Sequence, residues 1–198
     1  MAGRLLAVAI TGGIAAGKTE ALAAFERRGA VVSSADAIVH RIYREDGELK
    51  DELRARWGDR VFDAAGEVDR GAVAAIVFAD PDELAWLERV LHPRVARAHE
   101  QWLAELAARP DPPELVVVEI PLLYETGGEA RYDKVVVVTA SRAARAGRRG
   151  GGFEARESRL IADDEKVRRA DFAYVNDGSL EELDAFVAGV VEELASSS

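Results

Sequence analysis

The segment TGGIAAGKT (11–19) carries the residues best suited to chemistry in this chain. Gly12, Gly17, Lys18 and Thr19 follow the spacing Gly-x-x-x-x-Gly-Lys-Thr, which is typical of a loop that cradles phosphates. Glycines let backbone N–H groups turn toward oxyanions without a side chain in the way. A lysine at this place can reach the β- and γ-phosphates of a nucleoside triphosphate, and the threonine hydroxyl can bind Mg²⁺.

The elements on either side of this loop favour the same interpretation. The apolar run LLAVAI (5–10) predicts a buried strand before it, and the pattern over 19–28 predicts a helix after it. Such a helix would add the positive end of its dipole to the phosphate site. The alternative is a glycine-rich turn with a solvated lysine. On the phosphate interpretation, the triphosphate lies against Gly12, Gly13, Ile14, Ala15, Ala16, Gly17, Lys18, Thr19 and Glu20, with Thr19 as the Mg²⁺ ligand.

Two carboxylates follow the ends of predicted strands, where ligands collect in an open α/β sheet. Asp36 comes just after the strand at 30–33, and it could accept the proton of an attacking hydroxyl or cap the next helix instead. Glu119 ends the run LVVVE (115–119), and it could hold a Mg²⁺-bound water or be an ordinary acid at a strand end. The residues alone leave both pairs of alternatives open.

Four arginines follow the strand at 134–139 with near-helical spacing: Arg142, Arg145, Arg148 and Arg149. Arg145 with Arg148 or Arg149 could bind phosphates from a closing lid. The glycines at 150–152 could act as the hinge of this lid. The alternative is a solvated basic helix face. Because the chain carries a net charge of −10, we favour the lid.

Strands and helices must alternate to bring these residues together. Apolar, β-branched runs predict strands at 5–10, 30–33, 115–120, 134–139 and 171–176. Helical patterns lie between and after them at 19–28, 35–43, 141–149, 154–169 and 179–195, the last one with a capping box formed by Ser179 and Glu182. This order predicts an α/β fold with a doubly wound, parallel, five-stranded sheet, as in P-loop nucleoside triphosphate hydrolases.

A helical lobe interrupts this sheet in the sequence. The pattern over 48–108 is helical, contains no convincing strand and is broken at Gly58, Gly66, Pro81 and Pro93. We therefore expect one domain over 1–198. Its parts are a core at 1–45 and 114–198, an inserted lobe at about 46–110 and a lid at about 142–165.

The composition restricts the partners and the compartment. The chain has no cysteine, which excludes disulfides, thiolate metal sites and cysteine nucleophiles and fits a reducing cytosol. Its 36 acidic residues outnumber the 26 basic ones, which argues against broad electrostatic binding to nucleic acid or to an anionic membrane. No apolar run approaches the ~20 residues of a membrane span, and the first run does not lead into a signal-peptide cleavage site. We therefore expect a cytoplasmic protein.

Five segments together resemble the dephospho-coenzyme A kinase family and follow its order of motifs over most of the chain. They are ITGGIAAGKT (10–19), SADAIVHRI (34–42), IVFADPDELAWLERVLHPRV (76–95), VVVEIPLLYETG (116–127) and KVRRADFAYVNDGSLEEL (166–183). Many families share the phosphate loop. The combination of His92-Pro93 with IPLLYE (120–125) is far more specific.

This resemblance implies transfer of the γ-phosphoryl group of ATP to the ribose 3′-hydroxyl of dephospho-coenzyme A, the last step of coenzyme A synthesis. It implies that Asp36 is the general base, that Lys18 and Thr19 serve ATP and Mg²⁺, and that Arg145 belongs to the lid. Asn176 would lie near the adenine of ATP. The lobe would help to shape an acceptor pocket that includes Asp36, His92, Leu122, Leu123 and Glu125. The protein would work as a monomer or a small homo-oligomer.

The chain also departs from the family pattern. The first acid of the Asp-x-Asp segment is Ser34, so only Asp36 remains to act as base. Ala15 and Ala16 stand where glycine and serine are usual, which should cost little because backbone N–H groups bind the phosphates. Leu160 replaces a usual glutamine, and the lid segment at 150–153 fits poorly. Two alternatives therefore stay open: another small-molecule kinase, such as a nucleoside monophosphate kinase, or a nucleotide-binding module without turnover.

Overall fold

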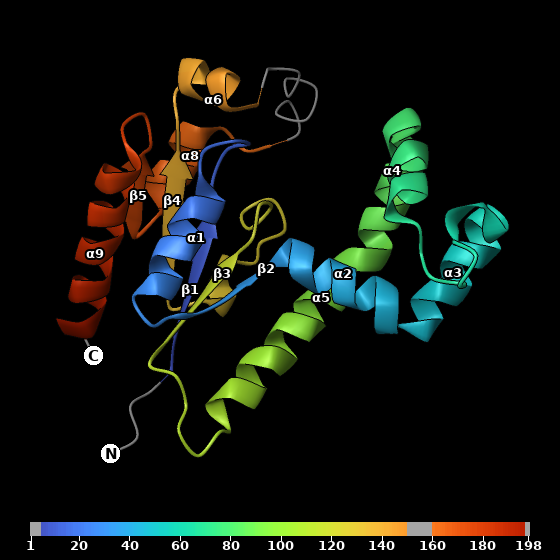
Figure 1. Cartoon of the computed structure of the whole chain (residues 1–198), viewed down its shortest axis with the longest axis horizontal. Coiled ribbons are helices and arrows are strands. Elements are labelled where there is room, and N and C mark those ends of the chain that lie inside the picture. The colour runs from blue at the N-terminus through green and yellow to red at the C-terminus, as the bar shows by residue number, and fades with distance from the viewer. Residues whose placement is uncertain (1–4, 150–159, 197–198) are drawn as a thin grey trace. The chain divides into compact units, whose positions relative to one another are not determined.

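The computed structural model describes residues 5–149 and 160–196. It contains a parallel sheet of five strands in the order β2-β3-β1-β4-β5 (Figure 1). The strands are β1 (Leu6–Thr11), β2 (Val31–Ser34), β3 (Leu115–Glu119), β4 (Lys134–Thr139) and β5 (Phe172–Val175). The predicted parallel, five-stranded α/β fold is therefore confirmed.

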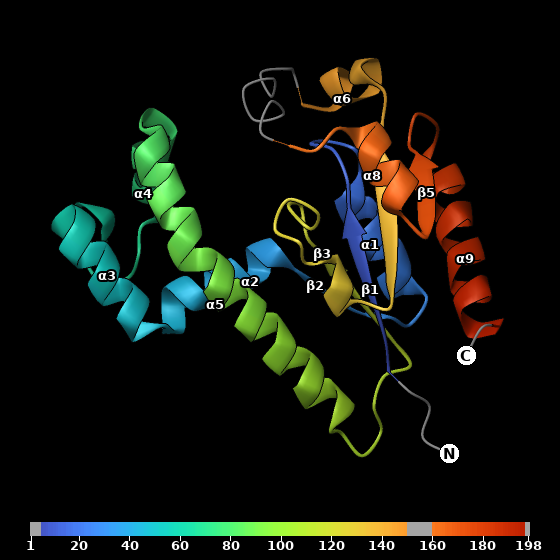
Figure 2. The ribbon, with the colours of Figure 1, turned by 180° about the vertical axis from the view of Figure 1, so that it is seen from behind.

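Helices cover both faces of this sheet. The helices that belong with it are α1 (Lys18–Arg27), α6 (Arg142–Arg149), α8 (Asp163–Arg169) and α9 (Leu180–Ser196). Figures 1 and 2 show α1 and α9 on one face and α8 on the other. Alternate residues of β1 serve the two faces, since Val8 and Ile10 pack into the cluster with α1 and α9 and Ala9 packs into a separate cluster. Burial on both faces explains why the strands read as continuous apolar runs.

The strand β1 is central, with β3 on one side and β4 on the other. The chain leaves its carboxyl end directly into the glycine-rich loop. In parallel sheets of this kind, ligands bind outside the carboxyl ends of the strands, where neighbouring connections diverge. Ser34 and Glu119 end β2 and β3 as register partners at the same edge. The fold therefore brings the predicted phosphate loop and Glu119 to one end of the sheet.

The contacts divide the chain into two compact units. Residues 1–34 and 106–198 form the unit with the sheet, and residues 35–105 form a helical unit. The strand–helix alternation predicts that residues 35–45 belong to the core, whereas the contacts of α2 (Ala35–Glu45) group it with the helical unit. The reason is its apolar face, because Ile38, Ile42 and Tyr43 are buried in the cluster of that unit.

The helical unit contains four helices and one short 3₁₀ turn within its described residues. They are α2, α3 (Gly47–Trp57), η1 (Gly58–Val61), α4 (Arg70–Ala79) and α5 (Pro81–Ala107), whose last two residues group with the sheet unit. Their shared core consists of Ile38, Ile42, Tyr43, Leu49, Leu53, Trp57, Val61, Val73, Val77, Leu87 and Leu91. The breaks predicted at Gly58 and Pro81 are confirmed, since α3 ends before Gly58 and α5 begins at Pro81.

Pro93 does not break its helix, so that part of the prediction is wrong. The helix α5 runs through Pro93 although proline cannot donate the backbone hydrogen bond of its turn. The neighbouring Arg94 fixes this part of α5, because its guanidinium pairs with Asp46 at 3.1 Å and with Glu52 at 2.7 Å. Tertiary contacts therefore outweigh the loss of one backbone hydrogen bond.

The helix predicted at 154–169 is shorter in the structure. Residues 154–159 lie outside the described residues, 160–162 are not helical, and α8 begins at Asp163. Three acids occupy the first turn of α8 and three basic residues its last turn, an arrangement that complements the helix dipole. The capping box of α9 is confirmed, since Ser179 N donates to Glu182 Oε2 at 3.0 Å and Glu182 N donates to Ser179 Oγ at 3.2 Å.

Glu83 joins the start of α5 to the end of α3. Its carboxylate accepts hydrogen bonds from Arg56 Nε and from Trp57 Nε1, each at 2.9 Å. These bonds, that from Arg56 first, hold the pKa of the Glu83 carboxyl below its usual range. Trp57 in turn meets Trp86 edge-on, with the ring centroids 5.0 Å apart. One carboxylate therefore connects two helices and orients an aromatic pair.

Replacing Glu83 with glutamine should remove a pH-dependent part of the stability. Because the pKa is lower in the folded protein, the stabilisation is present above the unfolded-state value of roughly 4.3 and is lost as the pH falls through the folded value. Urea unfolding followed by tryptophan fluorescence should show Glu83→Gln less stable than wild type at neutral pH. The difference in unfolding free energy between Glu83→Gln and wild type should become steadily smaller at more acidic pH. Glu88→Gln, on the same helix and without an ion pair among the described residues, should show no such gap.

Candidate phosphate-binding site

The loop between β1 and α1 has no room for side chains at two of its glycines. Gly12 has a φ of +139°, and a Cβ atom built there would lie 1.9 Å from the Val138 carbonyl oxygen. Gly17 has a φ of +97°, and a Cβ atom there would lie 2.2 Å from Asn176 Nδ2. Real Cβ atoms essentially never make contacts below 3.0 Å. Both positions therefore require glycine, for the backbone angle and for the close approach.

Ala15 adopts the left-handed conformation that glycine usually takes. Its φ is +58°, and within residues 5–149 and 160–196 no other residue besides glycine has a positive φ. An L-residue in this region costs roughly 1 to 2 kcal/mol. The sequence predicts a small cost at this position because the phosphates meet backbone N–H groups. The structure adds a cost of a different kind, which lies in the backbone angle.

The side chain of Lys18 folds back over the start of the loop. The residue is 8% exposed, and Nζ donates hydrogen bonds to the carbonyl oxygens of Gly12 at 3.2 Å and Gly13 at 2.8 Å. No side chain caps the first turn of α1, which begins at Lys18. The ammonium group thus lies within the segment that also begins helix α1, which is the combination expected of a polyphosphate site.

Asn176 and Arg148 hold the loop in place from the far end of the chain. Asn176 is buried after β5 and donates from Nδ2 to the Ala16 carbonyl at 2.8 Å. Arg148 of α6 donates from Nη2 to the Asn176 carbonyl at 2.7 Å and from Nη1 to the carbonyls of Ala15 and Ala16 at 3.4 Å. No pattern in the sequence links Asn176 to a residue 160 positions away. Its predicted place near adenine stays a prediction.

Arg145 and Asp163 lie beside the same loop. A Cβ atom built on Gly13 would lie 3.3 Å from Arg145 Nη1 and 2.9 Å from Asp163 Oδ2. The structure thus brings the predicted lid arginine to the phosphate loop, together with a carboxylate that the sequence analysis missed. Arg142 is exposed, and the side chain of Arg149 and the lid segment at 150–153 lie outside the described residues. The only sequence signal for Asp163 is its place among the acids that begin α8.

Thr19 and Glu119 supply oxygens that suit Mg²⁺. Thr19 Oγ1 donates to Glu119 Oε2 at 3.5 Å. A hydroxyl and a carboxylate are hard ligands of the kind that Mg²⁺ prefers, and the ion takes the rest of its shell from water and substrate phosphates. Among the residues that the structure describes, His, Asp and Glu form no group of three that could hold a metal ion. The two residues therefore fit an ion that arrives with a nucleotide.

The predicted acceptor residues of the helical unit are exposed. Asp36 lies in the first turn of α2 and makes no hydrogen bond or ion pair with another described residue. It is not the N-cap, because the helix already includes Ala35. His92 lies on the surface of α5 directly before Pro93. Both side chains are therefore accessible to a ligand.

The turn after β3 holds the other predicted acceptor residues, and they differ in exposure. Leu122 is half-buried. Leu123 is fully buried in the cluster on the α8 face of the sheet, so a ligand contact would require it to leave that cluster. Glu125 Oε1 lies 2.8 Å from Lys166 Nζ and accepts a hydrogen bond from Ile161 N at 3.0 Å. The carboxylate of Glu125 is thus engaged by the segment that includes α8.

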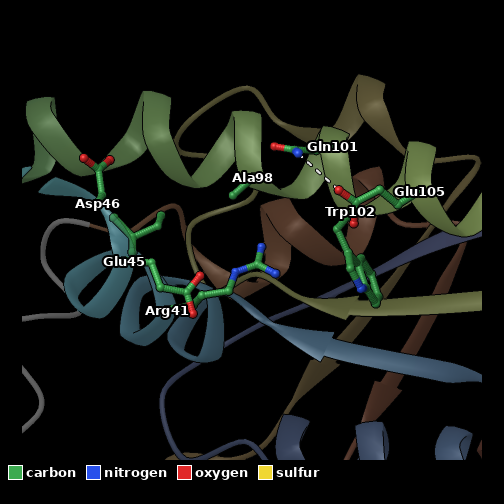
Figure 3. A pocket seen from close by; sticks show the side chains of 8 residues that line it. Arg41, Glu45, Asp46, Ala98, Gln101, Trp102 and Glu105 are labelled. Carbon is green, nitrogen blue, oxygen red and sulfur yellow. Dashed lines mark hydrogen bonds between the residues drawn. The ribbon is translucent and has the colours of Figure 1, made fainter. Parts of the chain in front are cut away.

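A hollow of about 330 Å³ lies within the helical unit, between α2 and α5 (Figure 3). Its walls are formed by Arg41, Ile42, Glu45, Asp46, Ala98, Gln101, Trp102 and Glu105. Gln101 Nε2 donates to Glu105 Oε1 at 3.1 Å across one turn of α5. The walls combine one guanidinium with three carboxylates, which distinguishes this hollow from the cationic phosphate loop.

Three comparisons relate the chain to known proteins. Residues 6–182 match the family model described as dephospho-CoA kinase. A dephospho-CoA kinase from Bradyrhizobium diazoefficiens is 36% identical over 192 residues, which cover 93% of this chain and 94% of that protein. The structure of TT1252 from Thermus thermophilus is 36% identical, covers 96% of this chain and 98% of its own, and gives a TM-score of 0.75. Dephospho-CoA kinase from Campylobacter jejuni is 26% identical with the same coverage and a TM-score of 0.70.

Gly17→Ala should abolish nucleotide binding, whereas Gly29→Ala should leave it intact. Both glycines have a positive φ, +97° and +90°, but a Cβ atom on Gly29 would meet nothing within 4 Å. Each variant should lose roughly 1 kcal/mol of unfolding free energy through the strained backbone angle. Only Gly17→Ala should also displace Asn176 and distort the loop. Titration with a fluorescent ATP analogue measures the effect, and equal affinities in the two variants would contradict it.

Proposed function

The chain belongs to the dephospho-CoA kinase family, and from this premise we propose how its residues carry out the reaction. The enzyme transfers the γ-phosphoryl group of ATP to the 3′-hydroxyl of dephospho-coenzyme A, which yields coenzyme A and ADP in the last step of coenzyme A biosynthesis. The comparisons do not favour the alternatives, another small-molecule kinase or a module without turnover. One observation carries the placement of ATP: Lys18 Nζ lies against Gly12 and Gly13 in a loop that has no room for a side chain at Gly12 or Gly17.

ATP binds with its phosphates along this loop in our proposal. The N–H groups of residues 13–19 surround the phosphate oxygens, and Lys18 exchanges its two carbonyl partners for the β- and γ-phosphates. Arg145 contributes a second cation beside Gly13, where charge spreads over the transferring group. The proximity of Arg145 Nη1 to Gly13 supports this role. Asn176 supports the loop through Ala16 and is also placed near the adenine.

Thr19 and Glu119 hold Mg²⁺ in this proposal. The hydroxyl of Thr19 is a direct ligand, and the carboxylate of Glu119 orients water in the shell of the ion. Bound there with the nucleotide, Mg²⁺ would supply positive charge against the negative charge that develops during the transfer. The 3.5 Å separation of the two side-chain oxygens supports a shared site.

Asp36 is the general base. The acceptor oxygen forms its bond to the γ-phosphorus while the bond from that phosphorus to the bridging oxygen of ADP breaks, and the hydroxyl proton passes to the carboxylate. A carboxylate without a partner among the described residues is available for this task. Its place in the chain gives further support, because it comes two residues after Ser34, which ends β2 beside Glu119.

In our proposal, His92 and Leu122 contact the acceptor. Leu123 instead supports the turn after β3 from within the apolar core. The exposure of His92 and the partial exposure of Leu122 support this division. The resemblance to the family also predicts that Glu125 belongs to the acceptor pocket. The lobe that carries His92 is the acceptor-binding part of the chain, and the segment at about 142–165 is the lid.

We place the enzyme in the cytoplasm, as a monomer or a small homo-oligomer. The absence of cysteine fits a reducing compartment. Within the described residues, no helix is both long enough and apolar enough to cross a membrane. The proposed partners are therefore the two substrates, ATP and dephospho-coenzyme A.

Asp36→Ala should lower turnover by a factor of about 10² to 10⁴, the usual contribution of a general base. Affinity for ATP should stay near that of wild type, because the carboxylate acts on the acceptor. The assay is ATP-dependent formation of coenzyme A by purified protein, in which nucleoside monophosphates should not compete with dephospho-coenzyme A. Asp51→Ala, an exposed acid on α3, is the control and should keep full activity. Full activity of Asp36→Ala would exclude this base.

Thr19→Val should remove most of the gain in ATP affinity that Mg²⁺ provides. Valine has nearly the shape of threonine but offers no oxygen ligand. ATP titrations with Mg²⁺ and with excess chelator measure this gain directly, independent of turnover. Thr19→Ser keeps the hydroxyl and should restore the gain. A wild-type response to Mg²⁺ in Thr19→Val would show that the hydroxyl is not a ligand.

A further inference from the structure

Glu125 and Lys166 form an ion pair inside the unit with the sheet. Lys166 Nζ lies 2.8 Å from Glu125 Oε1, and the two side chains are 0% and 13% exposed. Taking two charges out of water is costly, and apolar residues of similar volume often stabilise a fold as well or better. The pair therefore points to a role in placing a segment of the chain rather than to stability alone.

The same carboxylate oxygen holds a second group of the same segment. Glu125 Oε1 accepts a hydrogen bond from Ile161 N at 3.0 Å. Ile161 lies two residues before α8, and Lys166 is its fourth residue. One oxygen atom thus fixes the chain on both sides of the first turn of α8. Arg169, the last residue of α8, pairs with Glu129 of the short 3₁₀ helix η2 (Glu129–Arg131), so both ends of α8 are held by the connection between β3 and β4.

These contacts fix the position of Asp163 at the start of α8. It lies between Ile161 and Lys166, and its Oδ2 would be 2.9 Å from a Cβ atom built on Gly13. Arg145 Nη1 approaches the same position at 3.3 Å. A shift of α8 would therefore move a carboxylate at the phosphate loop and alter the charge that a nucleotide meets there.

We propose that Glu125 and Lys166 are positioning residues for ATP: together they hold the first turn of α8, and Asp163 with it, against the phosphate loop. This role replaces the acceptor contact that family resemblance assigns to Glu125. Both contacts of Glu125 Oε1 lead to the segment that carries Asp163, and Lys166 has no exposed surface through which it could meet a substrate. The inference rests on the phosphate site of the proposed function.

The test compares Glu125→Gln and Lys166→Met with a matched variant of the same helix. Arg168→Met is that control, because Arg168 forms an exposed ion pair with Glu165 on α8. Steady-state assays give the KM for each substrate, and ATP titration without acceptor gives the nucleotide affinity. Both pair variants should raise the KM for ATP about tenfold or more, since a small misplacement in a site is costly. The KM for dephospho-coenzyme A should not change, and Arg168→Met should change neither constant.

Three outcomes would overturn this role. A higher KM for dephospho-coenzyme A in Glu125→Gln alone would return Glu125 to the acceptor pocket. Circular dichroism gives the fraction of each variant that is folded. If both variants are folded and keep the wild-type KM for ATP, the pair has a purely structural role. Failure of Lys166→Arg, which keeps the charge, to bind ATP better than Lys166→Met would exclude the ion pair as the cause. Absence of turnover in wild type would instead contradict the proposed function, and ATP affinity alone would still test the positioning role.

Discussion

The close approach of backbone to backbone at Gly12 is the constraint on which the rest of the structure depends. Pairing of β1 with β4 in a parallel sheet brings the Val138 carbonyl against the start of the loop, where any side chain would collide. Asn176, which follows β5, closes the other end of the loop against Gly17. The loop can therefore keep its shape only if three strand ends are in register. The apolar core on both faces of the sheet maintains that register.

The two faces of the sheet contribute differently to this site. On one face, α1 and α9 pack through apolar side chains and fix the helix that begins at the loop. On the other face, α8 is attached through charges, with Lys166 paired to Glu125 and Arg169 to Glu129. Separating a buried ion pair leaves uncompensated charges and is strongly unfavourable, so the pair of Glu125 and Lys166 resists displacement. The charged face is therefore the one that sets where Asp163 stands relative to Gly13.

Most of the fold follows from local sequence patterns. Runs such as VVVVT (135–139) are strands because a buried parallel strand needs apolar residues on both faces, and Gly-Lys-Thr marks the start of α1. The errors arise where contacts distant in sequence decide the outcome. Arg94 pairs with Asp46, which precedes α3, and with Glu52 within α3, and these contacts keep α5 helical across Pro93. The predicted start of α8 is wrong, since the helix begins at Asp163 and residues 160–162 before it are not helical.

The candidate site shows the same division between local and distant information. The sequence predicts Lys18 and Thr19 because one short segment contains both residues at a known spacing. It does not predict the partners of Asn176 and Glu125, because these partners are distant in sequence and close only in the folded chain. The strain at Ala15 was also hidden, since composition says nothing about the sign of a backbone angle. Sequence thus reveals a site's reactive groups more readily than the residues that hold them.

Lys18 already has two partners in this loop, the carbonyl oxygens of Gly12 and Gly13. In the proposed function, phosphate binding is for that reason an exchange, in which the Lys18 ammonium leaves these carbonyl oxygens for phosphate oxygens. The net free energy of such an exchange is much smaller than the strength of the new contacts suggests. A single inorganic phosphate would form few contacts beyond those that replace the two carbonyl hydrogen bonds of Lys18. A chain of three phosphates would also contact the amides along the loop. If Lys18 binds phosphate as proposed, its contacts with Gly12 and Gly13 would make the loop discriminate by the length of the polyanion.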